Sequence, residues 1–393
     1  MEQPLKGIKV LDLSLMWALP GTAMFLADQG ADVIKVEPPA GDPGRTTFTL
    51  TPVGDVSQSF FVLNRNKRAI VVDIRKPEGK EIILKLAKDA DIVMHNFRPG
   101  VDKRLGIDYE SIYQINPRVI YFSITPWGPK GPLANNRAYD RLVQAISGIQ
   151  GRRRLPDGTP LTAGVWVADC SAPGFMGYAI MLALFQREKT GQGQKVESSL
   201  LNCAIAIQSV DLIRVETEQE PPKYLADAAT LNPYRCADNE WIIIIIVTND
   251  EWGKLTSVMG IEHLVNHPHF NTPLARTENA AEMSQILEKI FLTKKRDEWV
   301  KLFHEHDVPS APIINPEEVF THPQIVENEM LVGVDQPGVG KVWMMNTPFK
   351  LSGSPKVGKR PAPAFGEHTE EVLRELGYSK EQMDELRQTG IIK

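Results

Sequence analysis

The chain has 393 residues, of which 42% are hydrophobic and 24% are charged, and its net charge at pH 7 is -5. This length predicts two or three domains that each bury a core, and the composition excludes an intrinsically disordered chain. A net-acidic chain has no general affinity for nucleic acid, so we expect no nucleic-acid partner.

The first residues and the cysteines indicate the compartment. The N-terminus lacks a basic segment followed by an apolar one, and no uninterrupted apolar run of about 18 residues occurs, so we expect a cytoplasmic protein with no membrane partner. The three cysteines, Cys170, Cys203 and Cys236, have no CxxC spacing. They therefore predict neither a disulfide framework nor a thiolate metal site.

The N-terminal half alternates strands and helices. Residues 7–14 and 32–37 are short and apolar, which is typical of strands, and residues 20–31 between them have helical periodicity. The pattern continues with strands at 68–74, 91–97 and 118–124 and helices at 77–90 and 109–117. Such alternation predicts an α/β fold with a parallel, Rossmann-like sheet that helices cover on both faces.

The glycine fingerprint of dinucleotide-binding sheets is absent. The segment after the first strand, "LSLMWALPG", contains no GxGxxG. A nicotinamide or flavin clamped at a helix N-terminus is therefore not expected. We predict no permanently bound cofactor.

The second half begins after a polar, proline-containing segment at residues 215–233, which is typical of a linker. It contains "WIIIIIV" at 241–247, which we expect to be a fully buried strand because an exposed one would promote aggregation. Further helices are predicted at 249–259, 279–292 and 296–306, and at 367–377 and 379–390. We predict three parts: a large domain at 1–215, a smaller α/β domain at 216–330, and a C-terminal segment at 331–393 that returns to the large domain.

Histidine patterns do not predict a metal centre or a catalytic base. His263 and His267 have the i, i+4 spacing of zinc ligands, but Pro268 interrupts that helix and no glutamate lies between them. No histidine occurs between Asn96 and Glu262. We therefore expect no bound metal.

Three potential nucleophiles, Asp169, Cys170 and Ser171, are adjacent in the segment "GVWVADCSAPGF". A serine or cysteine needs a neighbouring base, which the histidine positions do not indicate, and the segment lacks the GxSxG pattern. Asp169 follows an apolar, strand-like stretch at 160–168 and precedes a long apolar helix, so we expect it to be largely buried. It is either the N-cap of that helix or a carboxylate nucleophile that is already ionised at neutral pH.

Seven motifs resemble those of the class III (CaiB/BaiF) CoA-transferases, the group that includes formyl-CoA, carnitine and phenyllactate CoA-transferases. The resemblance covers nearly the whole chain, in the family's order. Its motifs are "GIKVLDLS", "LADQGADVIKVEPPAGDPGR", "NRNKRAIVVDIRKPEGK", "NFRPGVDKRLGIDYE", "NPRVIYFSITPWGPKGP", "REKTGQGQKVE" and "GEHTEEVLRELGY".

The resemblance implies CoA transfer from an acyl-CoA donor to a carboxylic acid acceptor, with coenzyme A as substrate. Asp169 matches the family's nucleophile, which forms an aspartyl anhydride and then an aspartyl-CoA thioester. Asp140 matches an acidic position that lies close to the nucleophile in some members. The family also implies an interlocked homodimer.

The resemblance carries a set of CoA-contacting positions over to this chain, among which arginines suit phosphates because they bind them bidentately. Relatives that act on oxalate carry an amide at the position of Trp17 and a glycine-rich loop that this chain lacks. Pro38 stands where some relatives have a CoA-contacting arginine. The Met16–Trp17 pair therefore predicts a larger apolar acyl group, aromatic or branched. The implied CoA positions are Trp17, Ala18, Val72, Asp73, Ile74, Arg75, Asn96, Phe97, Arg98, Arg104, Arg137 and Tyr139.

Two other functions fit part of this pattern. The α-methylacyl-CoA racemases share most of these motifs but use a histidine about 30 residues before the aspartate, where this chain has Tyr139. A tyrosine phenol is a poor general base at neutral pH, which favours the transferase. A CoA-binding protein without catalysis requires Asp169 to be only a cap.

Overall fold

The computed structural model describes residues 2–47, 56–216, 228–355 and 358–393. These residues form two compact units: unit 1 spans Met1–Ile213 and Glu329–Lys393, and unit 2 spans Arg214–Asn328. Residues 217–227 of the predicted linker lie outside the described residues.

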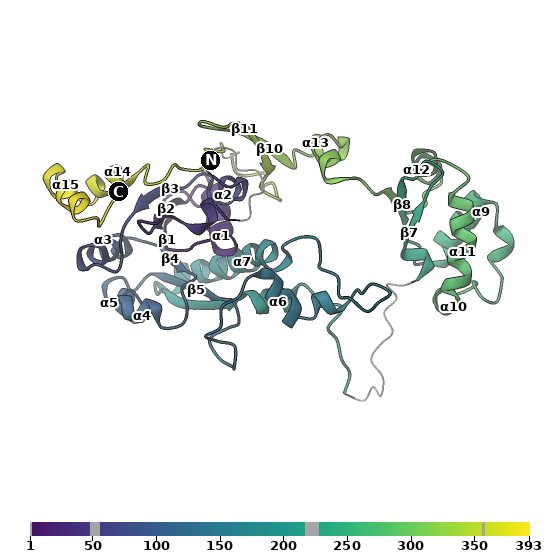
Figure 1. Cartoon of the computed structure of the whole chain (residues 1–393), viewed down its shortest axis with the longest axis horizontal. Helices are drawn as coiled ribbons and strands as arrows, with labels where there is room; N and C mark the ends of the chain where they lie inside the picture. The colour runs from purple at the N-terminus through teal and green to yellow at the C-terminus, as the bar shows by residue number, and fades with distance from the viewer. Residues whose placement is uncertain (1, 48–55, 217–227, 356–357) are drawn as a thin grey trace. The chain divides into compact units, whose positions relative to one another are not determined.

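Unit 1 is built on a six-stranded parallel sheet (Figure 1) with the strand order β3-β2-β1-β4-β5-β6. The predicted α/β class is confirmed, and the order is that of doubly wound nucleotide-binding sheets, in which ligands bind where β1 and β4 diverge. The strands are β1 (Lys9–Asp12), β2 (Asp32–Glu37), β3 (Arg68–Val71), β4 (Ile92–His95), β5 (Ile120–Thr125) and β6 (Gln194–Ser199).

Helices cover both faces of this sheet because its strands are apolar on both sides. Val10 faces one core with α1 (Ala18–Asp28) and α7 (Val167–Thr190). Its neighbour Leu11 faces the other core, formed with α3, α5, α14 and α15. The bounds are α3 (Pro77–Lys88), α5 (Tyr109–Ile115), α14 (Thr369–Glu375) and α15 (Lys380–Gln388), and the remaining helices of unit 1 are α2 (Gln58–Asn64), α4 (Val101–Leu105), α6 (Asp140–Ile146) and α8 (Leu200–Ala206).

The segment before α7 differs from its prediction. Residues 161–165 are exposed loop and not a strand, and only Pro160 makes an isolated bridge, to Arg154. The sixth strand of the sheet is β6, which follows α7 in the chain. Exposed residues alternate along β6, as suits an edge strand. The nucleophile candidate therefore follows a loop, which leaves its side chain open to a ligand.

Helix α7 has the length and composition of a membrane-crossing helix. One such helix is weak evidence of a membrane span, because core helices of soluble proteins can have the same length and composition. In unit 1 its residues Met176, Ile180 and Leu184 pack into the core with α1. One face of α7 therefore belongs to the core, whereas Tyr178, Leu182 and Phe185 on the same helix are exposed.

The C-terminal segment packs on the β3 side of the sheet. The Asp73 N–H donates to the Ile391 carbonyl at 2.8 Å, and the Val71 N–H donates to Thr369 Oγ1 at 3.1 Å. A hairpin of β10 (Leu331–Gln336) and β11 (Gly340–Met345) precedes this part. Residues far apart in sequence thus complete one unit.

Unit 2 contains an antiparallel sheet of β7 (Pro233–Arg235), β8 (Trp241–Ile244) and β9 (Ser310–Pro312). The expectation that the isoleucine strand is fully buried is wrong: Ile242, Ile244 and Ile246 are buried, whereas Ile245 is 42% exposed. An antiparallel sheet covered on one face gives this alternation. The helices are α9 (Asn249–Met259), α10 (Pro273–Glu278), α11 (Ala280–Phe291), α12 (Arg296–Glu305) and α13 (Pro323–Glu327).

Candidate active site

A cavity of about 290 Å³ lies in unit 1 at the carboxyl ends of the central strands. Its walls come from the loops that follow β1, β4 and β5 and from the starts of α6 and α7. This is the place where doubly wound sheets bind ligands. Nine predicted site residues line the cavity: Trp17, Ala18, Asn96, Phe97, Arg98, Arg137, Tyr139, Asp140 and Asp169.

Asp169 lies in the first turn of α7, three residues after the N-cap. The N-cap is Trp166, so the alternative interpretation of Asp169 as the N-cap is wrong. The Asp169 side chain is half-buried and reaches the cavity. Its position near a helix N-terminus favours negative charge there.

Asp140 contacts Asp169 through the backbone. The Asp169 N–H donates to Asp140 Oδ2 at 2.9 Å, and Gln144 Nε2 donates to Asp140 Oδ1. Asp140 is fully buried, at the first position of α6. It therefore caps the start of α7 from a neighbouring helix, a role that the side chain of Trp166 does not perform.

The environment of Asp169 is unfavourable to its charged form. Burial, and secondarily the charge of Asp140, raise the pKa of Asp169 to about 7. No cationic side chain among the described residues counters this effect. This environment opposes the expectation of a carboxylate that is already ionised at neutral pH, because burial favours the neutral acid.

The neighbouring nucleophiles have no activating base in the described parts of the chain. Burial, with the charges of Asp169 and Asp140, raises the pKa of the Cys170 thiol, which makes a thiolate scarce. Ser171 Oγ donates to the Ala168 carbonyl at 3.4 Å. Both observations favour Asp169 over these two residues.

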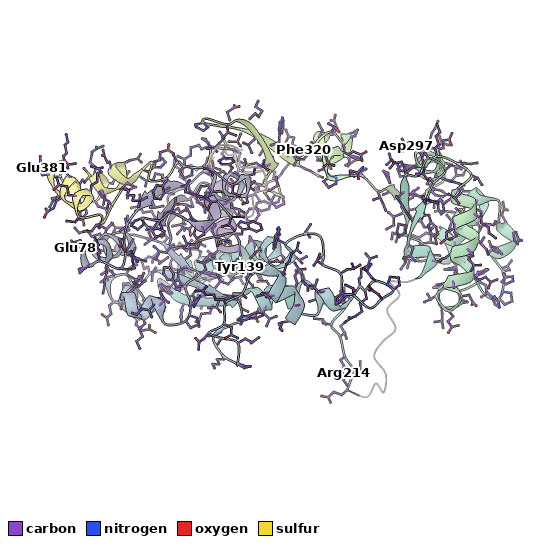
Figure 2. The ribbon with its side chains drawn as sticks, viewed as in Figure 1. Glu78, Tyr139, Arg214, Asp297, Phe320 and Glu381 are labelled. Carbon is purple, nitrogen blue, oxygen red and sulfur yellow. The ribbon has the colours of Figure 1, made fainter. Side chains whose placement is uncertain are left out.

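Two further residues bear on the question of a general base: His95, at the end of β4, and Tyr139, at the position of the racemase histidine. Burial lowers the pKa of His95 to about 4, and its ring stacks on Phe97 at a centroid distance of 4.8 Å. Tyr139, labelled in Figure 2, directly precedes α6 and is 58% exposed. His95 is not among the cavity-lining residues, whereas Tyr139 is.

The loop between β1 and α1 carries Trp17 and is held by Asn96. Asn96 Oδ1 accepts from the Leu15 N–H at 3.1 Å, and Asn96 Nδ2 donates to the Leu15 carbonyl at 2.7 Å. The Trp17 and Trp166 rings meet edge to face at 5.2 Å. The Asn96 amide is thus engaged by the protein itself.

The predicted positions at 72–75 lie beside a second, smaller cavity of about 80 Å³. Val72 and Ile74 line it, and Leu15 and Phe97 line both cavities. Asp73 and Arg75 are not lining residues; they form a bidentate pair at 2.8 Å. The two cavities are therefore neighbours that share a wall.

The four predicted arginines are exposed, as residues that receive a soluble phosphate must be. Arg98 and Arg137 line the main cavity, whereas Arg75 and Arg104 do not. Arg104 lies in α4, which follows the Arg98 loop. The arrangement thus offers two cations at the cavity and two farther away.

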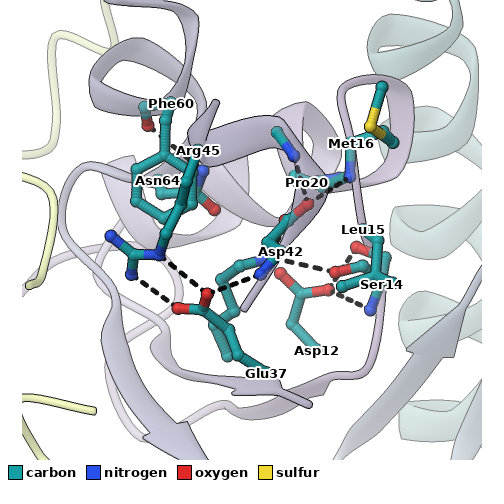
Figure 3. A network of polar contacts seen from close by, with 12 residues as sticks. Asp12, Ser14, Leu15, Met16, Pro20, Glu37, Asp42, Arg45, Phe60 and Asn64 are labelled. Carbon is teal, nitrogen blue, oxygen red and sulfur yellow. Dashed lines mark hydrogen bonds and ion pairs between the residues drawn. The ribbon is translucent and has the colours of Figure 1, made fainter. Parts of the chain in front are cut away.

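A buried ion network lies beside the loop that carries Met16 (Figure 3). It comprises Asp12, Lys35, Glu37, Asp42, Arg45 and Lys67, in which every acid has a cationic partner. Although burial opposes it, the charges of Lys67 and Lys35 lower the pKa of Asp12. Asp42 Oδ1 accepts from the Met16 N–H at 3.0 Å, which links this network to the cavity loop.

The sequence did not single out Trp166, Gln144 or Asp42 as site residues. Gln144 lies at i+4 from Asp140, a spacing that places both on one helix face and could have indicated their contact. Trp166 precedes the nucleophile by one turn. No local signal marks Asp42 as a site residue, since the pairing of β1 with β2 brings it to the Met16 N–H.

Among the described residues, no group of three or more histidine, cysteine, aspartate or glutamate residues could hold a metal ion. His269 Nδ1 lies 2.8 Å from Glu282 Oε2, and no zinc-like cluster forms there.

Comparisons with known proteins give one consistent result. The model of the CoA-transferase family III matches residues 5–369. The chain is 34% identical to an acyl-CoA transferase of Fusarium pseudograminearum, over 99% of this chain and 88% of that protein. It is 32% identical to human succinyl-CoA:glutarate CoA-transferase, over 99% of this chain and 90% of that protein. A CaiB/BaiF family protein from Brucella suis superposes with a TM-score of 0.84 at 33% identity, covering 96% of this chain and 100% of that one.

Proposed function

The chain belongs to CoA-transferase family III and is an enzyme of that class; we propose that it moves CoA between carboxylic acids by covalent catalysis on Asp169. The observation that carries the proposal is a half-buried carboxyl group with a pKa of about 7 and no cationic partner among the described residues. A carboxylate with a raised pKa is a better nucleophile than an ordinary one, and such shifts cluster at functional sites.

The first half of the reaction transfers CoA to the enzyme. An Asp169 oxygen attacks the thioester carbon, the C–S bond breaks, and a mixed anhydride and CoA thiolate form. The thiolate then attacks the Asp169 carboxyl carbon and releases the donor acid. The product is a thioester between Asp169 and CoA.

The second half repeats these steps in reverse with the acceptor acid. Its carboxylate displaces the thiolate from Asp169 to form a second anhydride, and the thiolate attacks the acceptor carbon. The new acyl-CoA leaves and the Asp169 carboxylate is restored. Because one thioester replaces another of similar energy, the protein needs only to position the groups and stabilise the charges.

We infer that CoA lies along the carboxyl ends of the strands. Arg98 and Arg137 line the main cavity and suit phosphate groups, and Arg104 extends this charge. The small cavity at Val72 and Ile74 adjoins the main one through Leu15. The homodimer and the cytoplasmic location remain predictions.

The acid substrate is proposed to be apolar and larger than formate or oxalate, because the apolar side chains of Met16, Trp17 and Trp166 line the cavity. A second candidate is a longer dicarboxylate: Arg98 and Arg137 line the same cavity, and a relative is named a succinyl-CoA:glutarate CoA-transferase. A panel of aromatic, branched and dicarboxylic acids, with new CoA esters followed by mass spectrometry, separates these candidates.

The mechanism is tested by Asp169→Asn with Cys170→Ser as the matched control. The amide is nearly isosteric but a far weaker nucleophile, so transfer should fall by about 1,000-fold or more with folding intact. Hydroxylamine trapping of wild type with acyl-CoA should modify Asp169, and Cys170→Ser should keep both the label and the activity. Near-normal transfer by Asp169→Asn, or loss of the label in Cys170→Ser, would contradict the mechanism.

A further inference from the structure

Met16 has a backbone conformation that residues other than glycine rarely adopt. Its φ angle is 71°, in the left-handed region. For a methionine this conformation is strained, because Cβ crowds the following carbonyl oxygen. Such strain persists only where the surroundings impose it.

The surroundings of Met16 do impose it, residue by residue. The Ser14 carbonyl accepts from Lys35 Nζ at 2.9 Å. Both backbone polar groups of Leu15 bond to the Asn96 amide. The Met16 N–H donates to Asp42 Oδ1, and Asp42 Oδ2 lies 2.7 Å from Lys35 Nζ.

The loop also has little room to move away from the cavity. Gly44 packs directly behind it: a Cβ built on Gly44 would lie 3.3 Å from the Met16 carbonyl oxygen and 3.4 Å from its Cα. The Asp42 carboxylate also accepts from the Gly44 N–H at 2.8 Å. One carboxylate therefore fixes both the loop and the segment behind it.

Met16, Trp17 and Asp169 line the same cavity. Trp17 meets Trp166, which is the N-cap of the helix that carries Asp169. A shift of Met16 would therefore change the space beside the nucleophile.

We propose that Met16 determines acid specificity and that Asp42 and Asn96 are positioning residues that hold it in its strained conformation. The inference rests on the proposed CoA transfer. A fixed methionine limits the volume open to the substrate acid, whereas a relaxed loop would let the wall retreat. Asn96 then acts through Leu15.

The first test compares Met16→Ala with wild type on acetate, isovalerate and phenylacetate as acceptors of CoA from one donor. Removing the thioether should raise kcat/KM for phenylacetate relative to acetate by roughly tenfold, mainly by lowering KM. This is the scale of the effect of removing one group from an apolar pocket. An unchanged ratio would overturn the role of Met16. If wild type transfers CoA to no acid, the proposed function fails instead.

Met16→Gly isolates the backbone strain. Glycine adopts positive φ freely, so this variant should melt at a higher temperature than Met16→Ala. If Asp42 and Asn96 hold the backbone, the two variants should nevertheless rank the three acids alike. Different rankings would show that the side chain at position 16, and not the two anchors, fixes the loop.

Asp42→Ala and Asp42→Asn test the anchor itself. The alanine variant loses the acceptor for the Met16 N–H, so its ratio of kcat/KM for phenylacetate to that for acetate should move toward the ratio of Met16→Ala. The asparagine variant keeps an acceptor oxygen and should have the wild-type ratio. Thermal melts establish that each variant is folded. A folded Asp42→Ala with the wild-type ratio would overturn the positioning role, and if neither variant folds, the Met16→Gly comparison decides it.

Discussion

Two groups of buried carboxylates in unit 1 differ in their partners. In the buried ion network, Asp12, Glu37 and Asp42 each face a lysine or arginine within 3 Å. In the candidate active site, the Asp140 carboxylate accepts from the Asp169 backbone N–H and from the Gln144 side-chain amide. Neither donor is a cation.

The consequence is opposite protonation behaviour. Asp12 has a lowered pKa despite complete burial, because Lys67 and Lys35 outweigh the desolvation. Asp169 has a pKa raised to about 7, because nothing cationic among its described neighbours outweighs it. Burial alone does not decide the charge of a carboxyl group, and the placement of cations separates structural acids from reactive ones.

The largest effect should come from breaking a pair in the ion network. Lys67→Met keeps the length of the side chain but leaves Asp12 buried without its 2.9 Å partner. Loss of one member of a buried pair costs about 3–5 kcal/mol of stability. Urea denaturation should show this loss, whereas Lys6→Met, which removes an exposed pair with Glu2, should change stability by under about 1 kcal/mol. Equal effects of the two substitutions would mean that the network is not structural.

A smaller effect should appear in the pH dependence of transfer. The reactive form of Asp169 is the carboxylate, so kcat/KM should rise about tenfold per pH unit below 7 and level off above it, because kcat/KM reports the free enzyme. Asp140→Asn removes the like charge and should move this limb to lower pH, by less than the whole shift because burial is the larger cause of the raised pKa.

The exposed Asp157→Asn serves as the control for this experiment and should leave the limb where it is. A wild-type limb below pH 5 would mean that Asp169 is an ordinary carboxylate. A limb that Asp140→Asn does not move would mean that the Asp140 charge does not reach it.

The central sheet could be predicted because its strands are short apolar runs separated by helices with their own periodicity. Leu11 and Val93 lie in one core and their neighbours Val10 and Ile92 in the other, which is the pattern of a strand buried on both faces. β6 escaped prediction because its sequence, QKVESS, is mostly polar and it lies at the edge. Apolar periodicity carries no signal for such a strand.

The active-site candidate was predictable only in part. The family motifs pointed to Asp169, but its pKa is raised first by burial and then by the charge of Asp140, 29 residues earlier in the chain. The strain of Met16 depends on Asp42 and Asn96, which reach the loop through the order of β1, β2 and β4. The pKa of Asp169 and the backbone conformation of Met16 could not be predicted from the sequence, because both depend on contacts that only the fold creates.

The smallest effect concerns stability and has the opposite sign to that of Lys67→Met. A carboxyl group whose folded pKa lies above its unfolded value of 3.8 costs the folded state stability as pH rises from about 4 to about 7, and the full cost remains above that range. Asp169→Asn removes the titration. It should therefore stabilise the protein at pH 8 by on the order of 1 kcal/mol, a figure kept low because the group is half-buried and the helix dipole favours the carboxylate.

The pH series makes this last comparison decisive. The gain in stability from Asp169→Asn should shrink as the pH falls and vanish below about pH 3, where this position is protonated in both the folded and the unfolded wild type. Asp157→Asn, in an exposed loop, should show no such gain at pH 8. If Asp169→Asn lowers the melting temperature at pH 8 by as much as at pH 4, the carboxylate is not strained by its surroundings, and Asp169 belongs with the stabilised acids of the ion network.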